Sequence, residues 1–299
     1  MAKYNAYTEG ISLVHDFADK VKGRTFLLTG PSKGGTGAET VISLAHGAPA
    51  ITILLGRSLN KIQPTIDSIK EINETIKVKF VKVDLASLSS TRTAAETILA
   101  DDEIVHIDVV VDDNAAVMAC TYQKTEDGFE LQLAANYLGH FVLTNTIIPK
   151  ILAAGSYGEF AAYGSSKSAM ILYAVALNQR LASRGVHAYG LHPGSIMQDH
   201  LEALGPAAME IMDDGSWRVM GMSIAKFRAT CPTKTLQQGC ATTLRAALDP
   251  RLVEEDGVYL EDSNLVTDIR LIKEWASDSE LADKYWKLSE EVVGQKFEF

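Results

Sequence analysis

The sequence predicts an α/β fold in which helices cover both faces of a doubly wound parallel sheet, within a single domain that takes in residues 1–299. Two observations support this prediction. Short apolar runs of strand length alternate with longer segments of helical periodicity, and that alternation is typical of parallel sheets. The chain also shows no internal repeat, low-complexity tract or linker that would divide it.

The first half of the chain alternates regularly between the two kinds of segment. Residues 24–30, RTFLLTG, are a short apolar run that ends in glycine, as a buried strand does before a turn. Polar-faced helical segments and further apolar runs follow in turn. The predicted strands are 24–30, 51–57, 78–85 and 107–111, and the predicted helices are 37–46, 60–72 and 87–99.

The second half predicts longer helices. Two apolar segments, 127–152 and 161–184, have helical length, and 186–194, VHAYGLHPG, predicts a strand that ends at a Pro-Gly turn. Thr235 is placed to cap a helix that runs to Leu248. The remaining predicted elements are an edge strand at 258–260 and, from the spacing of Leu281, Trp286, Leu288 and Val292, a C-terminal helix within the tail 277–299.

Residues 198–234 are the segment with the weakest pattern. They lack strand periodicity and are rich in Met, Ala and Gly. We expect either a helical lid over a substrate pocket or a helical insertion without that role.

Composition narrows the range of partners. The net charge of −10 argues against nucleic acid or an anionic membrane as the main partner. Cys120, Cys231 and Cys240 are odd in number and lack metal-ligand spacing, which favours a reducing compartment and predicts neither a disulfide framework nor a metal site. The N-terminus does not read as a secretory signal, and no apolar run approaches the roughly 20 residues that span a bilayer. We therefore expect a cytoplasmic protein.

A glycine-rich segment, TGPSKGGTGAET (29–40), joins the first predicted strand to the first predicted helix. Its glycines let the backbone turn tightly and approach a pyrophosphate, and the helix N-terminus offers unpaired N–H groups. The alternative is an ordinary strand-to-helix turn. The candidate cofactor-binding residues here are Gly30, Ser32, Lys33, Gly34, Gly35 and Gly37.

The end of the second predicted strand bears on the choice of cofactor. An acidic residue there would bind the ribose 2′-hydroxyl of NAD, but Arg57 stands in this place and can pair with a 2′-phosphate. Lys33 can reach the same region, and two cations without a carboxylate favour NADP(H) over NAD. The alternative for each cation is a solvated surface charge. Asp84, after the third strand, is placed either to touch the adenine or to cap the next helix.

These residues and several further motifs resemble the short-chain dehydrogenase/reductase family, and in particular its NADP-dependent, retinol-dehydrogenase-like branch. The resemblance extends over nearly the whole chain. It implies a Rossmann-like fold, NADP(H) as cofactor, and hydride transfer to or from a small ketone, aldehyde or secondary alcohol. It also implies a homodimer or homotetramer formed through the helices 127–152 and 161–184. The motifs are TGPSKGGTG, LLGRS, VDL, DNAAVM, LQLAANYLGHFVLTN, YGSSK, LHPGSI and LADKYWKLSEE.

The resemblance also assigns roles. Tyr163 would be the general acid, and Lys167, expected one helical turn further on, would lower its pKa and bind the nicotinamide ribose. Asn136 would position a water in the proton relay; the alternative is a polar residue that bonds its own helix. The residues that would lie along the cofactor or near its nicotinamide are Asn114, Ala115, Pro193 and Gly194.

The chain departs from the family pattern at four places. The glycine loop has one extra residue, the motif NNAG appears as DNAA (113–116), and Gln198 stands where a threonine is usual. The fourth departure is larger: a fifth strand that ends in the catalytic serine, and much of the loop after it, are expected between Leu152 and Tyr163 and have no counterpart. The intact flanking motifs favour an excised block of about 30 residues over divergence to a new function.

Three interpretations follow for this chain. The first is an NADP-dependent carbonyl reductase or alcohol dehydrogenase, slow or inactive because the lost serine would have held the carbonyl. The second is a catalytically inactive NADP-binding protein that keeps the family's shell. The third is a poorly folding product of a gene read incorrectly across Gly155–Ser156.

Overall fold

The computed structural model describes most of the chain. The described residues are 3–112, 117, 120–153, 158–163, 167–196, 233–266 and 276–299, with single residues or pairs between 210 and 229. For 158–163 and 167–169 it describes the backbone alone. The predicted lid, 198–234, therefore lies almost wholly outside the described residues.

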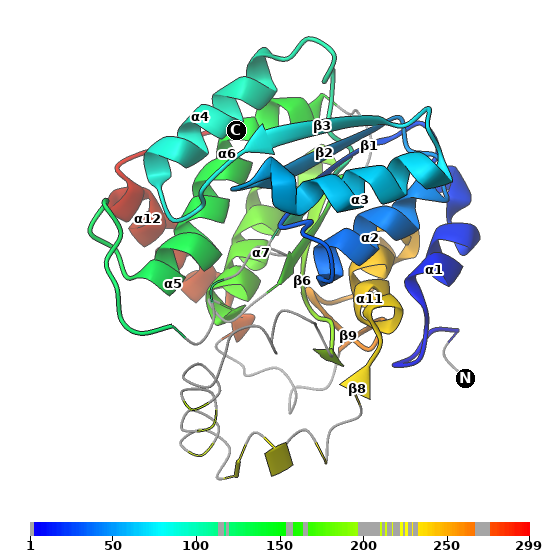
Figure 1. The fold of residues 1–299 in the computed structure, drawn as a ribbon. Helices are drawn as coiled ribbons and strands as arrows, with labels where there is room; N and C mark the ends of the chain where they lie inside the picture. The colour runs from blue at the N-terminus through cyan, green and yellow to red at the C-terminus, as the bar shows by residue number, and fades with distance from the viewer. Residues whose placement is uncertain are drawn as a thin grey trace.

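The predicted doubly wound α/β fold is confirmed. One eight-stranded sheet has the order β10-β9-β6-β5-β4-β1-β2-β3, and β1 to β6 and β9 are parallel (Figure 1). A two-stranded parallel ladder of β7 and β8 lies apart from it. The strands are β1 (Thr25–Thr29), β2 (Ile51–Gly56), β3 (Lys77–Lys82), β4 (Val109–Asp112), β5 (Gly158–Tyr163), β6 (Val186–His192), β7 (Ser195–Ile196), β8 (Thr233–Lys234), β9 (Tyr259–Glu261) and β10 (Asn264–Leu265).

Helices cover both faces of the sheet. On one face lie α1 (Gly10–Asp16), α2 (Thr36–Ala45), α3 (Leu59–Ile72) and α11 (Leu236–Leu248), and on the other lie α4 (Leu88–Ala100), α6 (Gly139–Leu152), α7 (Lys167–Leu181) and α12 (Ser279–Val293) (Figure 1). The short α5 (Leu131–Leu133) and the π-helix η2 (Ala134–Leu138) lead into α6, and the short 3-10 helices are η1 (Ala18–Lys20), η3 (Ala182–Arg184) and η4 (Pro250–Glu254).

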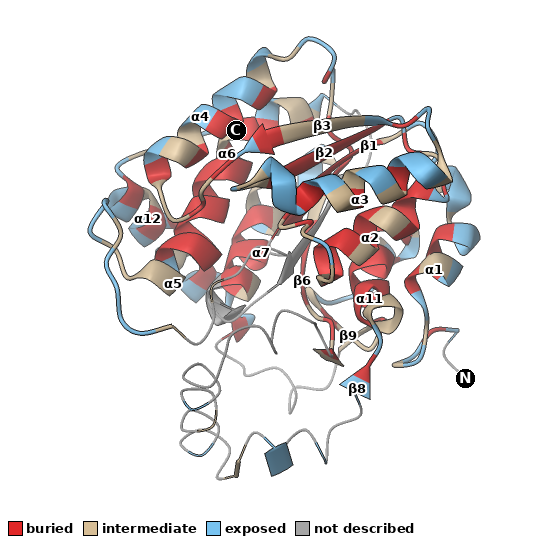
Figure 2. Cartoon of the chain, in the orientation of Figure 1, coloured by how far each residue is buried: buried red, intermediate tan, exposed pale blue. Residues whose placement is uncertain are grey.

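Each helical layer encloses its own apolar core against the sheet. Strand residues alternate between the two cores, as the period of two requires: Leu27 and Val110 belong to one, Leu28 and Val111 to the other. In Figure 2, β1, β2 and the inward helix faces are mostly buried, whereas exposed residues lie on the outer helix faces. Nearly every residue of β1, β2 and β4 is buried, which explains why their sequences are continuously apolar.

The expectation that the fifth strand is absent needs correction. Residues 158–163 form β5, which pairs in parallel with β4 on one side and β6 on the other; Val109 lies opposite Glu159, and Tyr163 opposite Leu191. An empty position at the centre of the sheet would leave backbone N–H and C=O groups of both neighbours unpaired, at a large cost. The segment directly before Tyr163 takes this position instead.

The helix predicted over 161–184 is consequently shorter. It begins at Lys167, and Tyr163 is the last residue of β5 rather than part of that helix. The helix predicted from residue 127 likewise begins only at Leu131, because Glu130 caps its first turn by accepting from the amides of Gln132 and Leu133. Other predicted elements agree to within a few residues, and Thr235 caps α11 as expected, in a capping box with Gln238.

The C-terminal helix α12 packs against α7 and the start of α6. Trp286 is buried and stacks with Tyr173 at 5.9 Å between ring centroids, while the Arg180 guanidinium lies 4.3 Å from the Trp286 ring. Arg180 also pairs with Asp283 at 2.7 Å. Helix α12 thus covers one face of α7. Oligomerisation through α6 and α7 stays a prediction, and it would have to use faces that α12 does not cover.

Candidate functional site

The carboxyl ends of the parallel strands bring most of the candidate residues to one edge of the sheet. Gly30 follows β1, Arg57 follows β2, Asp84 lies just beyond β3, Tyr163 ends β5 and Pro193 follows β6. The strand order reverses between β1 and β4, and in open α/β sheets a ligand binds in the crevice outside the strand ends at such a reversal. The topology therefore supports the predicted location of the site.

The glycine loop has the backbone conformation that its sequence predicts. Gly30 and Gly34 have φ angles of 63° and 81°, in the left-handed region that glycine adopts without strain. Gly35 is the N-cap of α2, and no side chain caps that helix. Its amide donates to the Ser32 carbonyl at 3.1 Å, which folds the loop back toward the helix. The N-terminus of α2, which no side chain caps, thus lies at the sheet edge, the kind of position where proteins bind anions.

Lys33 and Arg57 lie at this same edge. Both side chains are exposed, and neither pairs with a carboxylate in the described part of the chain. No acidic residue stands at the end of β2, where Gly56 is followed by Arg57 and Ser58. The charge at this position is therefore positive and accessible.

Asp84 forms a turn and does not cap the next helix. Its carboxylate accepts from the Ala86 amide at 3.0 Å, while its own amide donates to Ser90 Oγ at 2.9 Å. Ser87 is the residue that caps α4, since its hydroxyl accepts from the Ser90 amide. These two bonds hold the half-buried Asp84 in place, and its contact with the adenine stays a prediction.

Asn136 hydrogen-bonds Val117 rather than its own helix. Its Oδ1 accepts from the Val117 amide at 2.7 Å, and its Nδ2 donates to the Val117 carbonyl at 2.8 Å. It also lies in the middle of η2, a π-helical turn of the kind often found at functional sites. Asn136 therefore fixes Val117, which lies a few residues after the end of β4. Asn114 and Ala115 lie outside the described residues.

A buried polar cluster lies at the end of β4. Asp112, the last residue of β4, accepts a short hydrogen bond from the Thr144 hydroxyl, and its Oδ1 lies 3.2 Å from His140 Nδ1. All three side chains are almost fully buried, so Asp112 depends on these two partners rather than on water. The sequence analysis did not identify this cluster, because its three residues come together only in the fold.

The structure separates the predicted general acid from its lysine. Tyr163 ends β5 and Lys167 begins α7, so the two residues do not lie one turn apart on one helical face. Tyr163 instead stands at the strand end where the family resemblance places the catalytic serine. The prediction that these residues share a helix is wrong, because residues 158–163 pair with β4 and β6 as a strand of the sheet.

The turn after β6 is held by a residue that the sequence analysis also missed. Gly194 has a φ of 92°, and a Cβ there would lie 2.6 to 2.9 Å from Cδ, Cε and Nζ of Lys234. Lys234 comes from β8 and pairs with Asp262 at 2.5 Å. Only the fold brings these residues together, since they are far apart in the sequence.

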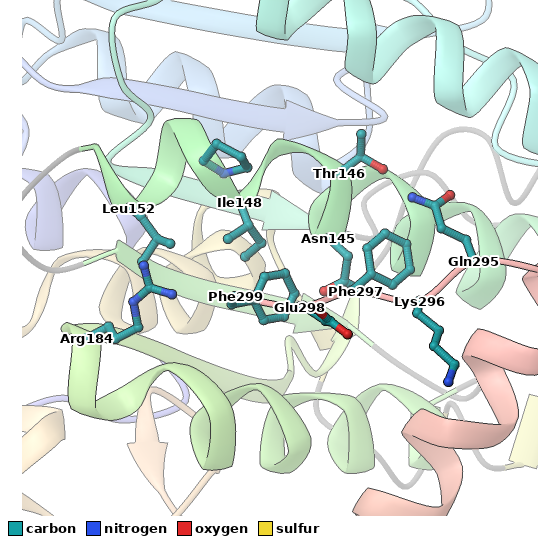
Figure 3. A pocket seen from close by; sticks show the side chains of 11 residues that line it. Asn145, Thr146, Ile148, Leu152, Arg184, Gln295, Lys296, Phe297, Glu298 and Phe299 are labelled. Carbon is teal, nitrogen blue, oxygen red and sulfur yellow. The ribbon is translucent and has the colours of Figure 1, made fainter.

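A cavity of about 540 Å³ lies elsewhere, between the second half of α6 and the C-terminal tail (Figure 3). Its lining includes Asn145, Leu152, Arg184 and Phe297, and none of the candidate cofactor residues. It opens toward the end of α6 that lies away from the carboxyl edge of the sheet. We therefore do not identify it with the candidate site.

The described residues contain no group of three or more His, Cys, Asp or Glu side chains arranged to hold a metal ion. Among their helices, none is both long and apolar enough to cross a bilayer.

Comparisons with known proteins agree with this geometry. The profile of the family described as short chain dehydrogenase matches residues 24–208. The chain is 34% identical to the short-chain dehydrogenase/reductase prx1 of Penicillium rubens over 279 residues, covering 83% of this chain and 76% of that protein. It is 27% identical to retinol dehydrogenase 12 of Mus musculus, covering 93% and 89%. A crystal structure of an uncharacterized protein from Mycobacterium paratuberculosis has the same fold, with a TM-score of 0.62, 23% identity and coverage of 93% and 96%.

The alignment with prx1 also bears on the length of the chain. It extends over 279 positions but takes in 83% of the 299 residues, or about 248, so about 30 positions stand opposite gaps in this chain. This shortfall agrees in size with the block that the resemblance predicts to be missing. That the block was lost between Leu152 and Tyr163 stays a prediction.

Proposed function

Because the chain belongs to the short-chain dehydrogenase/reductase family, we propose that it binds NADP(H) and transfers hydride between the nicotinamide and a ketone, an aldehyde or a secondary alcohol. The observation that carries this proposal is the glycine loop at the carboxyl edge of β1, which leads into the N-terminus of α2, together with the exposed Arg57 after β2, which pairs with no carboxylate among the described residues. The oxidoreductase names of its relatives support the reaction class.

The residues present fit a dinucleotide. The amides at the start of α2 would bind the pyrophosphate, and Gly34 and Gly35 allow the backbone to come close to it. Arg57 and Lys33 would bind the 2′-phosphate, for which a planar guanidinium offers paired donors. Asp84 would contact the adenine. The bound cofactor would supply or accept the hydride at its nicotinamide.

The proton would pass through Tyr163. In the reductive direction the carbonyl carbon gains the hydride while the carbonyl oxygen takes the proton of the Tyr163 hydroxyl. Lys167 would favour the phenolate and so make that proton easier to release. Asn136, through Val117, would hold the chain beside the cofactor.

We further propose that this chain turns over slowly. The lost serine strand removes the donor that would hold the carbonyl, and such a loss commonly costs on the order of 3 kcal/mol of transition-state stabilisation. The placement of Tyr163 at the end of β5 and Lys167 at the start of α7 adds to this loss, because no common helical face aligns them.

That same placement favours a second candidate function, a protein that binds NADP(H) without turnover. The cofactor loop is intact in this reading, whereas the catalytic pair is not. Oligomerisation and a cytoplasmic location stay predictions under both candidates.

A fluorescence titration of the 299-residue chain with NADPH and with NADH tests the cofactor. Tight NADPH binding with weak NADH binding supports the proposal, and binding of neither contradicts both candidates. A screen of ketones and aldehydes with NADPH then separates them. Turnover that Tyr163→Phe abolishes identifies an enzyme. NADPH binding with no turnover of any substrate favours the binding protein.

A further inference from the structure

Lys234 is a buried cation at the carboxyl edge of the sheet, and the proposed reaction does not use it. Its side chain is only 7% exposed, and its Nζ lies 2.5 Å from Asp262 Oδ1. A buried ammonium needs a partner of opposite charge, because its desolvation costs on the order of several kcal/mol. Asp262 supplies that partner from the turn between β9 and β10.

The Asp262 turn is itself held in an unusual conformation. Asp262 and Ser263 have φ angles of 50° and 61°, which non-glycine residues seldom adopt. Buried Arg245 of α11 donates to the Ser263 carbonyl, and the Ser263 amide donates to Thr242 Oγ1 at 3.1 Å. Helix α11 thus holds the turn so that the Asp262 carboxylate reaches Lys234.

On its other side Lys234 packs against the turn after β6. Gly194 leaves no space for even a methyl group next to the lysine stem. The Gly194 amide donates to His192 Nδ1 at 3.2 Å, and the next two residues pair as β7 with β8, the strand of Lys234. The side chain therefore connects the Asp262 turn to the Pro193–Gly194 turn.

We propose that Lys234 and Asp262 form a clasp that positions the Pro193–Gly194 turn and sets the local charge that this turn presents to the nicotinamide. Lys234 is thus a positioning residue. The second half of this inference rests on the proposed function, which places the nicotinamide beside the turn; the first half does not.

The charges around Lys234 give the clasp an electrostatic signature. Asp262 and Glu261 are the carboxylates that face it, and His192 lies 3.6 Å from Glu261. Burial first, and then the charge of Asp262, raise the pKa of Glu261. The nicotinamide of NADP⁺ is cationic whereas that of NADPH is neutral. Removing the Lys234 charge should therefore favour binding of NADP⁺ over NADPH, and removing the Asp262 charge should favour binding of NADPH over NADP⁺.

Hydrogen exchange of the cofactor-free chain tests the positioning. In Lys234→Met, which keeps the length of the stem, we expect the amides of Gly194, Ser195 and Ile196 to exchange about tenfold faster than in the unaltered chain. Asp262→Asn, at a half-exposed side chain, should have the same effect and guards against misfolding of the first variant. Unchanged exchange in both variants would overturn the clasp.

The matched control is Lys79→Met. Lys79 is a partly buried lysine of β3, at the opposite end of the strand order, and it pairs with Asp101 and Glu103 at 2.6 Å each. Its substitution removes one paired cation without touching the Pro193–Gly194 turn. We expect exchange at that turn to stay as in the unaltered chain, and acceleration by the control would likewise count against the clasp.

Titrations with NADPH and NADP⁺ test the charge. The ratio of the Kd for NADPH to the Kd for NADP⁺ should rise about threefold in Lys234→Met and fall about threefold in Asp262→Asn, since screened charges act at this edge. A purely structural role would move both variants in one direction or leave the ratio unchanged, which refutes the electrostatic half. If the unaltered chain binds neither form, the proposed function fails while hydrogen exchange still decides the positioning half.

Discussion

Replacing Arg57 with alanine should strongly reduce the preference of the site for NADPH over NADH. The guanidinium is exposed at the end of β2 and makes no ion pair with a described carboxylate, so its removal breaks no internal contact. The folded chain should keep its stability. Any change in binding then reports the loss of the contact with the 2′-phosphate.

The magnitude follows from the kind of contact. Hydrogen bonds to a charged group contribute about 1.5 to 3 kcal/mol, and an exposed pair belongs near the lower end because water screens it. At 1.4 kcal/mol for each factor of ten, the Kd for NADPH should rise about 10- to 30-fold. The Kd for NADH, which has no 2′-phosphate, should change by less than about twofold.

The assay is the fluorescence titration already described, with Lys22→Ala as the control. Lys22 is an exposed cation before β1, at the opposite edge of the sheet, and its loss changes the net charge equally. NADPH affinity should be the same in this control as in the unaltered chain. Equal weakening of NADPH and NADH by Arg57→Ala, or none, would refute the assignment of the 2′-phosphate to this residue.

Three further predictions concern stability. Gly139→Ala should lower the free energy of unfolding by about 1–3 kcal/mol in urea denaturation, because its Cβ would lie 2.2 Å from the Leu85 carbonyl oxygen; no loss would mean that α6 can move. Trp286→Ala should cost about 3–5 kcal/mol in the same measurement, and a cost below about 1 kcal/mol would contradict tight docking of α12. Burial alone would raise the pKa of Asp249, but Arg251 outweighs it and the pKa is lowered. The unfolded chain thus binds this proton more readily, so Asp249→Asn should reduce the loss of stability on acidification below about pH 4; an unchanged pH profile would count against the shift.

Local patterns determined a large part of this protein. The periodicity and the glycine positions predicted β1 to α4 to within a few residues, because those segments have strong local preferences and short turns. The glycine loop and Arg57 followed from the same local reading. Their geometry was predictable since Gly30 and Gly34 occupy conformations that only glycine adopts readily.

Only the tertiary structure decided the conformation of residues 158–163. The sequence GEFAAY has no strong preference, and its last three residues, 161–163, fall within the predicted helix 161–184. In the fold, however, β4 and β6 each need a partner along the edges that face one another. The backbone hydrogen bonds that a central strand makes with both neighbours outweigh a helical preference of roughly a few tenths of a kcal/mol per residue.

The polar contacts around the site were equally beyond the sequence. Asp112 with His140, and Lys234 with Asp262, are each about 28 residues apart in the chain. Neither pair has a local signature, because whether a charged side chain is buried depends on what packs over it. The sequence by itself determined the strands of the first half and the position of the cofactor loop. The tertiary structure decided that residues 158–163 form β5 between β4 and β6, because unpaired backbone groups at the centre of a sheet cost more than any local preference contributes.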